Sequence, residues 1–308
     1  MADKYRLITR SDFDGLVCAM ILKELDLIDD IKFVHPKDMQ DGLIEVTERD
    51  ITTNLPYVPG VGLAFDHHES ELLRVDGSGI TNYIIEGDAP SAARVVYNYY
   101  DGKNKLTRIT DEIMEAVDKA DSAQFTLEDI LHPKGWELLS FLMDARTGLG
   151  RFRNFRISNY QLMMKLIDFC LEHTIDEILE LYDVKERVDM YFEQQDLFKA
   201  QLEKVHEIVG DVVVLKLKDE DPIYTGNRFL IYAMYPETKI SVHVMWGLKK
   251  QNTVFTIGKS IVNRSSNVDI GKICLEYGGG GHKNAGTCQV PNEDAERLLP
   301  EILEKLQG

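Results

Sequence analysis

The residues of this chain that could do metal chemistry lie in two short clusters. Asp12 and Asp14 are separated by one residue, and Asp66, His67 and His68 follow one another. Carboxylate oxygens and imidazole nitrogens are common ligands of divalent cations. In the second cluster, one histidine could bind metal while the other hydrogen-bonds a phosphate or a leaving oxygen. Each cluster alone is also explained without metal, as a helix cap or as a polar turn.

A glycine-rich segment near the other end of the chain could hold an anion. The run from Gly278 to Gly281 has no side chains, so its backbone amides can approach a phosphate closely. The run is short and lies between a helix pattern and a strand pattern, which argues against a flexible linker. His282, Lys283 and Arg264 add hydrogen-bond donors, and an arginine can contact a phosphate through two nitrogens at once. We therefore expect an anion such as a phosphate to be bound by Gly279, Gly280, Gly281, His282, Lys283 and Arg264, with an ordinary surface arginine as the competing interpretation of Arg264.

A basic cluster stands out because the chain carries a net charge of −17. One interpretation is a cationic rim that guides a phosphate-rich substrate, with Phe152 or Phe155 stacking on a base. The other is a set of arginines that pair with local acidic residues on a helical surface. The sequence leaves both open for Arg146, Arg151, Arg153 and Arg156.

The elements that must position the acidic clusters alternate between strand and helix. This alternation predicts an α/β fold with a parallel sheet flanked by helices. Both acidic clusters follow predicted strands, and ligand sites of open α/β sheets lie at the carboxyl ends of strands. Apolar runs predict strands at 5–9, 31–35, 50–54, 62–65 and 80–85, and helical spacing predicts helices at 16–27, 91–100 and 110–119.

After residue 125 the predicted secondary structure changes twice, first to helices alone and then back to strands with helices. Residues 126–205 carry helical patterns and no convincing strand, which predicts a helical connector. Strands then return, so we expect a parallel-sheet domain at 1–190 and a smaller α/β domain with a mixed sheet at 206–308. In the smaller domain, strands are predicted at 211–217, 229–235, 240–246, 254–257 and 287–290, and helices at 268–277 and 292–307, with a break at Pro300.

Composition limits the kinds of partner. The apolar share of 44% and the charged share of 28% are ordinary for a soluble globular protein. No apolar run is long enough to cross a bilayer, and the first residues lack a signal-peptide pattern, so we expect a cytoplasmic location with no membrane partner. The strong negative charge repels long duplex nucleic acid, so an anionic substrate needs a local cationic site.

Taken together and in this order, four segments resemble motifs of the DHH phosphoesterase superfamily. This superfamily includes family II inorganic pyrophosphatases, exopolyphosphatases, single-strand exonucleases and phosphodiesterases of oligonucleotides or cyclic dinucleotides. The exopolyphosphatase-like branch is the one that the chain resembles most. The first motif resembles Asp-Phe-Asp-Gly at 12–15, the name-giving motif Phe-Asp-His-His-Glu at 65–69, the fourth Ala-Asp-Ser-Ala-Gln-Phe at 120–125, and the signature of the DHH-associated C-terminal domain Gly-Gly-Gly-Gly-His-Lys-Asn-Ala-Gly at 278–286.

The resemblance implies a parallel sheet that holds one or two Mn²⁺ or Mg²⁺ ions. It also implies a smaller C-terminal domain that closes over the cleft and binds substrate phosphate. In such enzymes, water activated by the metal attacks phosphorus. Carried over to this chain, the resemblance implies metal ligands at Asp12, Asp14, His67 and Asp121, a substrate contact at His68, and phosphate contacts at His282 and Arg264.

Two positions depart from the family pattern. The family usually has a histidine shortly before the first aspartate, where this chain has Arg10. The second motif normally supplies an aspartate that bridges two metals; the best-placed residue here is Asn54, with Asp50 as the fallback. Arginine cannot bind metal, and asparagine is a poorer bridge. We therefore expect one ion, with Asn54 as a weak ligand and Arg10 in the electrostatic place of the second ion. Arg10 and His68 are the candidate catalytic residues.

These features predict a divalent-metal-dependent phosphohydrolase that acts on phosphoanhydride or phosphodiester bonds. The expected substrate is polyphosphate, a short oligonucleotide or another small phosphorylated molecule, and a homodimer is one of the assemblies left open. The alternative is a catalytically impaired protein of the same fold that senses a phosphate or nucleotide, which Arg10 and Asn54 favour. A family II pyrophosphatase is disfavoured by the same two residues.

Overall fold

The computed structural model describes residues 4–68, 71 and 79–307. Contacts divide the chain into two compact units. Unit 1 consists of Met1–Gln124 and Pro133–Asp189, and unit 2 of Phe125–His132 and Met190–Gly308. The short segment Phe125–His132 therefore packs with the C-terminal part of the chain, which the sequence did not indicate. The division into domains 1–190 and 206–308 remains a prediction.

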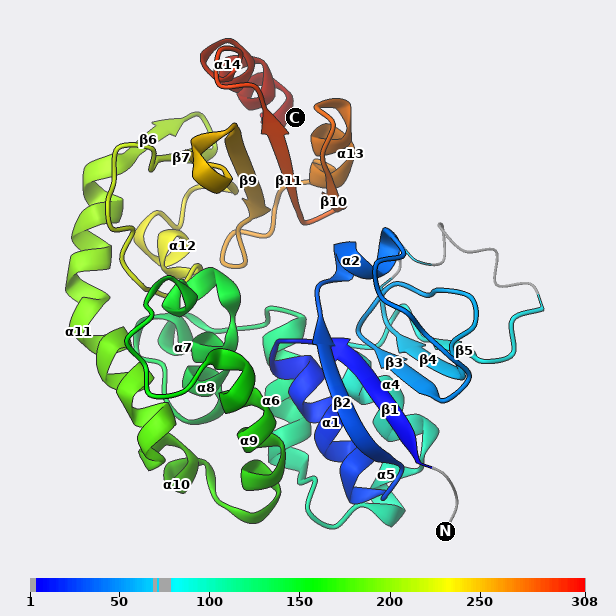
Figure 1. Ribbon diagram of the computed structural model, residues 1–308. Coiled ribbons are helices and arrows are strands. Elements are labelled where there is room, and N and C mark those ends of the chain that lie inside the picture. Colours follow the sequence, from blue (N-terminus) through cyan, green and yellow to red (C-terminus); the bar gives the residue numbers. More distant parts are fainter. Residues whose placement is uncertain (1–3, 69–70, 72–78, 308) are drawn as a thin grey trace. The chain divides into compact units, whose positions relative to one another are not determined.

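Unit 1 is built on the expected parallel sheet. In the described residues, the strand order is β2-β1-β3-β4-β5, and every neighbouring pair is parallel (Figure 1). Because all the strands run in one direction, their carboxyl ends meet at the same edge of the sheet. The strands are β1 (Tyr5–Arg10), β2 (Ile28–Val34), β3 (Asp50–Thr53), β4 (Leu63–Asp66) and β5 (Tyr83–Ile85).

Helix α1 (Phe13–Glu24) is the central helix of unit 1. Its residues from Phe13 to Leu22 are all buried, because the helix contacts β1, α4, α6 and α9. A helix that is apolar on every side is a core helix, and Asp14 is the acidic residue in its buried stretch. The other helices of this unit are α2 (Pro36–Gln40), α4 (Ala92–Tyr99), α5 (Gly102–Lys105), α6 (Asp111–Asp121), α8 (Gly135–Met143), the 3₁₀ turns η1 (Ala145–Thr147) and η2 (Leu149–Arg151), α9 (Asn159–Glu172) and α10 (Ile175–Glu180).

Unit 2 contains the expected mixed sheet. The order is β10-β11-β9-β8-β7-β6, and the β7–β8 pair is parallel while the other described pairs are antiparallel. Helices α13 and α14 pack against one face, where Val242, Phe255 and Ile302 belong to a common core. The elements are α7 (Leu127–Leu131), the long helix α11 (Tyr182–Val205) that begins in unit 1, β6 (His206–Val209), β7 (Val212–Lys216), α12 (Leu230–Met234), β8 (Ile240–Trp246), η3 (Leu248–Lys250), β9 (Thr253–Lys259), α13 (Ile270–Glu276), β10 (Gly280–His282), β11 (Ala285–Val290) and α14 (Ala295–Leu306).

Two predicted elements of unit 2 are wrong. Residues 229–235, expected as a strand, contain helix α12 instead, because a short apolar run fits either structure and its spacing cannot decide between them. Helix α14 continues through Pro300 rather than breaking there. Proline removes the hydrogen bond to the carbonyl four residues earlier, and that residue, Glu296, is exposed, so water can replace the bond.

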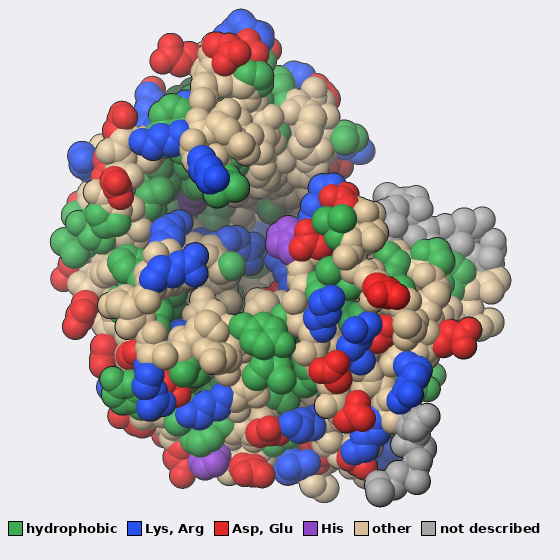
Figure 2. Space-filling view, in the orientation of Figure 1, with side chains coloured by type: hydrophobic (Ala, Val, Ile, Leu, Met, Phe, Trp, Pro, Cys, Tyr) green, Lys and Arg blue, Asp and Glu red, His purple; other side chains and the backbone are tan. Residues whose placement is uncertain are grey.

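Charged side chains of both signs lie close together on part of the surface (Figure 2). On the face drawn in Figure 2, acidic and basic side chains are interspersed over the surface around β1 and β2. Within the described ranges, no helix combines the length and the apolar character needed to cross a bilayer.

Candidate active site

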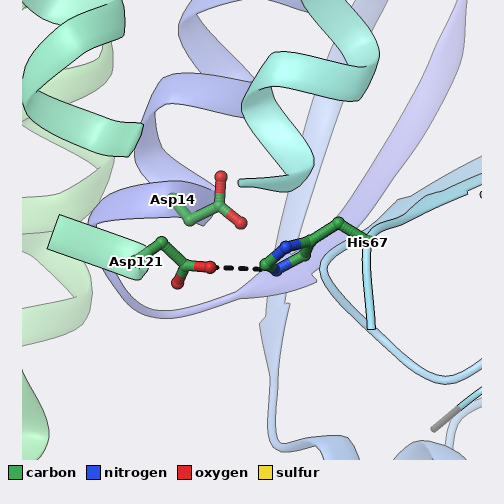
Figure 3. Close-up of side chains that lie close together, drawn as sticks. All are labelled: Asp14, His67 and Asp121. Atoms are coloured by element: carbon green, nitrogen blue, oxygen red, sulfur yellow. Dashed lines mark ion pairs between the residues drawn. The ribbon is translucent and has the colours of Figure 1, made fainter. Parts of the chain in front are cut away.

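Three side chains meet at the carboxyl edge of the unit 1 sheet and form what we call the Asp–His–Asp cluster. It consists of Asp14 in the first turn of α1, His67 directly after β4, and Asp121 at the end of α6 (Figure 3). One potential ligand atom from each residue lies within 4.8 Å of the others. The resemblance implied all three as metal ligands, and the fold brings them together from segments far apart in the sequence.

Asp14 is fixed by the start of a neighbouring helix. Its carboxylate accepts hydrogen bonds from the backbone amides of Ala92 (3.0 Å) and Ala93 (2.7 Å) in the first turn of α4, where the helix dipole favours negative charge. Burial and the nearby Asp121 raise the pKa of Asp14 well above its usual value. Gly15 allows this position, because a Cβ there would lie 1.9 Å from the Arg10 carbonyl oxygen and would push the start of α1 off the strand.

His67 presents one ring nitrogen to the cluster and uses the other for support. Its Nδ1 lies 3.1 Å from the Ala89 carbonyl oxygen, which makes Nδ1 the proton donor. Its Nε2 lies 2.9 Å from Asp121 Oδ2; this nitrogen is buried and has no well-aligned hydrogen bond within the described part of the chain. Burial by itself would lower the pKa of His67, but the Asp121 carboxylate raises it to about 9, and His67 in turn lowers the pKa of Asp121 against the effect of burial.

The Asp–His–Asp cluster fits a divalent cation. The buried carboxylate of Asp14 and the more exposed carboxylate of Asp121 repel one another at this distance, and a cation between them removes that repulsion. The support of His67 through Nδ1 is the arrangement that orients metal-binding histidines in proteins. Asp14, His67 and Asp121 are therefore the residues that would hold an ion, and the identity of the ion stays a prediction.

Asp12, although only two residues from Asp14, belongs to a different set of contacts, the Arg10–Asp12–Asn54 cluster. Arg10 Nε lies 2.9 Å from Asp12 Oδ2, and Asn54 Nδ2 donates to Asp12 Oδ1 at 3.2 Å. Asp12 Oδ1 also accepts from the Gly15 amide at 2.9 Å as the N-cap of α1. Burial raises the pKa of Asp12, and Arg10 acts against that rise. Asp12 thus already has a cation beside it.

Asn54 occupies the position after β3 at which an aspartate was expected. Its φ of 55° is in the left-handed region, which asparagine and aspartate tolerate better than most residues. Its Oδ1 is buried and has no hydrogen bond to any residue that the structure describes. The fallback, Asp50, lies at the opposite end of β3, where it binds Arg6 through Nε (2.7 Å) and Nη2 (2.9 Å).

His68 directly follows His67 of the Asp–His–Asp cluster, and its ring is oriented by Asp66. The sequence alone did not suggest this role for Asp66. Asp66 is buried and accepts from His68 Nδ1 at 2.7 Å and from the Tyr83 hydroxyl at 3.3 Å. A carboxylate on one imidazole nitrogen sets which nitrogen carries the proton. The signal was present in the sequence, because Asp66 directly precedes the two histidines.

Sequence reasoning also left the position of Arg146 open. Asp144 Oδ1 accepts from the Arg146 backbone amide at 2.9 Å and from its Nε at 2.7 Å. Burial would lower the pKa of Arg146, but Asp144 raises it and so do Asp12 and Asp121. Arg146 therefore lies within the field of both acidic clusters. Its position in η1, a 3₁₀ turn between two longer helices, is not readable from helical periodicity.

The rest of the basic cluster divides between the two interpretations. Arg156 binds the buried Asp183 through Nε (2.7 Å) and Nη2 (2.8 Å), as the local-pairing interpretation expects. Phe155 faces the buried guanidinium of Arg187, with Cζ 4.2 Å from the ring centre, so it is not set up to stack on a base. Arg151 covers Gly148, where a Cβ would lie 2.1 Å from Arg151 Nη1. Arg153 is exposed.

The predicted phosphate-binding residues lie in unit 2. Gly279 to Lys283 run through β10 and into its turn toward β11, and His282 and Lys283 are exposed. A Cβ at Gly279 would lie 2.1 Å from the Thr287 carbonyl oxygen, whereas the space beside Gly280 is open within 4 Å. Arg264 is exposed in the loop before α13, and its Nε donates to the Ile261 carbonyl at 3.1 Å. Phosphate binding by these residues remains a prediction.

Comparison with known proteins finds a relative over the whole chain. A solved structure described as a pGpG-specific phosphodiesterase, PggH from Vibrio cholerae, is 57% identical, and the match covers 98% of this chain and 99% of that one with a TM-score of 0.84. CDC45 from Entamoeba histolytica shares the fold alone, at 9% identity over 99% of this chain and 96% of that one, with a TM-score of 0.53.

A shorter similarity involves a curated protein of another kind. The A-adding tRNA nucleotidyltransferase of Aquifex aeolicus (strain VF5) is 34% identical over 111 residues, which are 32% of this chain and 12% of that protein. The chain thus spans only a small part of that curated relative. No protein-family model matches the sequence.

Proposed function

This chain belongs to the DHH phosphoesterase family, and from that premise we propose that it is a divalent-metal-dependent phosphodiesterase that hydrolyses a short linear dinucleotide such as pGpG. The observation that carries the proposal is the Asp–His–Asp cluster in a chain that matches a pGpG-specific phosphodiesterase over nearly its full length. That relative favours a phosphodiester bond over the phosphoanhydride bond of polyphosphate, which the sequence also allowed.

The proposed chemistry divides between the two clusters at the sheet edge. A divalent ion held by Asp14, His67 and Asp121 would neutralise charge that develops on the phosphoryl oxygens and would make water easier to deprotonate. Arg10 is held through Nε by Asp12, which leaves its two amino groups as the donors that can approach a phosphate oxygen. A cation fixed before the reaction begins stabilises the transition state without reorganisation.

We assign a proton to His68 on the basis of its support. Asp66 holds the ring through Nδ1, so Nε2 is the nitrogen that would exchange a proton with the substrate. Hydrolysis of a phosphodiester needs a proton on the leaving 3′ oxygen, and a positioned histidine can supply it as a general acid. His68 as a proton donor and Arg10 as a phosphate contact thus form the proposed catalytic pair.

One ion rather than two is part of the proposal. Asp12 binds Arg10 and Asn54 rather than joining the Asp–His–Asp cluster, and neither Arg10 nor the amide nitrogen of Asn54 is a metal ligand. The choice between Mn²⁺ and Mg²⁺ and the formation of a homodimer remain predictions.

The second candidate is the impaired sensor, which Arg10 and Asn54 favour because they replace a histidine and an aspartate expected in the family. This protein would bind a nucleotide without cleaving it. One ion and a fixed arginine can still stabilise a phosphoryl transition state, so we place the enzyme first.

The deciding experiment incubates the manganese-loaded protein with pGpG and separates the products by ion-exchange chromatography. The proposal predicts that each pGpG consumes one water and yields two GMP, with much slower phosphate release from polyphosphate. Asp121→Ala is the control for contaminating activity and is expected to be inactive. Tight pGpG binding without GMP formation would instead identify the sensor.

A further inference from the structure

A cavity of about 760 Å³ lies between helix α14 and one side of the unit 2 sheet. Its floor is apolar, because Val209, Val214 and Val244 line it from three neighbouring strands, β6, β7 and β8. Leu299 and Leu303 line it from α14. Sites for small molecules are concave, mostly apolar and about 300–1,000 Å³ in volume, so this cavity has the size and the lining of such a site.

The end of α14 ties one end of this cavity to the sheet. Gln307 lines the cavity directly after the last turn of the helix. Its Nε2 donates to the Val209 carbonyl at 2.6 Å, and its Oε1 accepts from the Asp211 amide at 3.2 Å. These bonds hold α14 to the turn between β6 and β7, so a ligand would not have to order the wall against the floor.

The two lysines that line the cavity already have partners. Lys216 Nζ lies 2.5 Å from Glu207 Oε2 on the neighbouring strand. Lys218 Nζ lies 4.2 Å from the centre of the Trp246 ring, a distance typical of a cation–π contact. The carboxylates that line the cavity outnumber these lysines and belong to Glu207, Asp219, Glu296 and Glu304. A cationic ligand therefore complements the cavity better than an anionic one.

Glu296 and Glu304 place two unpaired carboxylates in one row of α14. Neither carboxylate has a hydrogen bond or an ion pair with any residue that the structure describes. Each is four residues from Pro300, so the three share one side of the helix, and all three line the cavity. At 1.5 Å per residue, the Cα atoms of the two glutamates are about 12 Å apart. Because Pro300 has no N–H, the Glu296 carbonyl is a further acceptor on this side.

We propose that this cavity binds a linear polyamine, a chain of methylene groups with an ammonium group at each end. The terminal ammonium groups bind the carboxylates of Glu296 and Glu304, and the methylene groups lie on the valines and leucines between them. An extended chain covers about 3.5 Å for every three bonds, so about ten bonds span the separation of the two glutamates. Spermidine has this length, and its inner ammonium group can donate to the Glu296 carbonyl.

The experiment titrates spermidine calorimetrically into the manganese-loaded full chain. Glu296→Gln and Glu304→Gln are each expected to weaken binding by about threefold to tenfold, because each removes one exposed ion pair. The shorter 1,4-diaminobutane reaches only one of the two carboxylates and should bind about tenfold more weakly than spermidine. Glu301→Gln is the matched control. It removes the same charge from α14, but Glu301 binds Arg297 at 2.9 Å and does not line the cavity, so spermidine binding should stay unchanged.

The outcomes distinguish a polyamine site from general attraction to an acidic chain. Equal weakening in Glu301→Gln and in the two cavity variants, or equal affinity for spermidine and 1,4-diaminobutane, would mean that spermidine responds only to the net charge of −17 and would overturn the site. No spermidine binding to the wild type overturns it as well. If Glu296→Gln then changes the oligomeric state in sedimentation, the cavity is an interface between two copies of the chain. The site uses none of the residues proposed for catalysis, so its failure leaves the phosphodiesterase untouched.

Discussion

The Asp–His–Asp cluster and the Arg10–Asp12–Asn54 cluster lie on the same sheet edge, yet their carboxylates have opposite surroundings. Asp14, His67 and Asp121 each bring one ligand atom within 4.8 Å of the others, and His67 Nε2 lies 2.9 Å from Asp121 Oδ2. Asp12 instead contacts a guanidinium and an amide. In the first cluster the chain's own cationic group is an imidazole, which can give up its proton and bind a metal ion; in the second it is a guanidinium, which cannot.

This difference teaches that the neighbours of a carboxylate, rather than its place in a motif, decide what it can bind. Asp12 and Asp14 stand in one short motif; Asp14 is buried and Asp12 is partly exposed. Asp14 points toward the start of α4 and toward Asp121, whereas Asp12 caps α1 and binds Arg10.

The largest expected effect is that of Asp121→Ala, which removes one side of the Asp–His–Asp cluster. Loss of the ion removes several kcal/mol of transition-state stabilisation, so we expect kcat/KM for pGpG to fall about a thousandfold or more. Manganese should raise the melting temperature of the wild type and not that of the variant, because only the wild type binds the ion. Undiminished manganese stabilisation of Asp121→Ala would contradict the assignment of the cluster.

The next largest loss of activity is expected from Arg10→Ala, which tests the Arg10–Asp12–Asn54 cluster. Arg10→Ala removes the built-in cation and should lower kcat/KM for pGpG by about a hundredfold, the usual cost of losing one oxyanion donor. Manganese affinity should stay close to that of the wild type, because Arg10 is not a ligand. Arg10→Lys restores charge without the planar fork and should recover part of the rate. If Arg10→Ala abolished manganese binding, the two clusters would not be separate.

A double substitution should turn the Arg10–Asp12–Asn54 cluster into a second metal-binding site. Arg10→His with Asn54→Asp restores the ligand types usual in the family, and aspartate also tolerates the left-handed conformation of residue 54. We expect the manganese content to rise from one ion per chain to two, measured by mass spectrometry of the dialysed protein. Asn54→Asp alone, with Arg10 retained, is the control and should remain at one ion. A double variant that also stays at one ion would show that Asp12 cannot take part.

The smallest effect on activity is expected from Asp183, a buried aspartate that belongs to neither cluster. Arg156 and then Lys165 lower the pKa of Asp183 to about 2, so its ionised form stabilises the fold above about pH 4 and this contribution is lost as the pH falls toward 2. Asp183→Asn should lower the melting temperature by a few degrees at neutral pH and leave kcat/KM unchanged. The difference from the wild type should shrink below about pH 4; a difference that is the same at every pH would exclude ionisation as its cause.

Much of the fold could be predicted because its periodicity is local. The alternation of strands and helices in unit 1 predicts the parallel sheet, and β8 was predicted at its observed bounds. Helix α12 was missed because a run of apolar residues from Phe229 to Tyr235 does not reveal its own period. The assignment of Phe125–His132 to unit 2 depends on packing between distant segments, which no local pattern encodes.

Residues of the candidate active site could be predicted from the sequence where they stand in a recognisable motif. His67 and Asp14 lie in clusters that suggest metal chemistry by themselves, whereas Asp121 was identified only through the family resemblance. Arg146 lies in a 3₁₀ turn where Asp144, Asp12 and Asp121 raise its pKa, and the sequence could not distinguish it from Arg156, which pairs with Asp183. The sequence suggested only that Arg10 replaces the charge of a second ion. It did not predict the ion pair of Arg10 with Asp12, because that contact depends on the turn between β1 and α1.

The most direct test of the two-cluster account is anomalous diffraction from crystals grown with manganese. The account predicts one anomalous peak per chain, within bonding distance of Asp14, His67 and Asp121, while Arg10 remains bound to Asp12. A second peak between Asp12 and Asn54, or a single peak bonded to Asp12 instead of the Asp–His–Asp cluster, would contradict it.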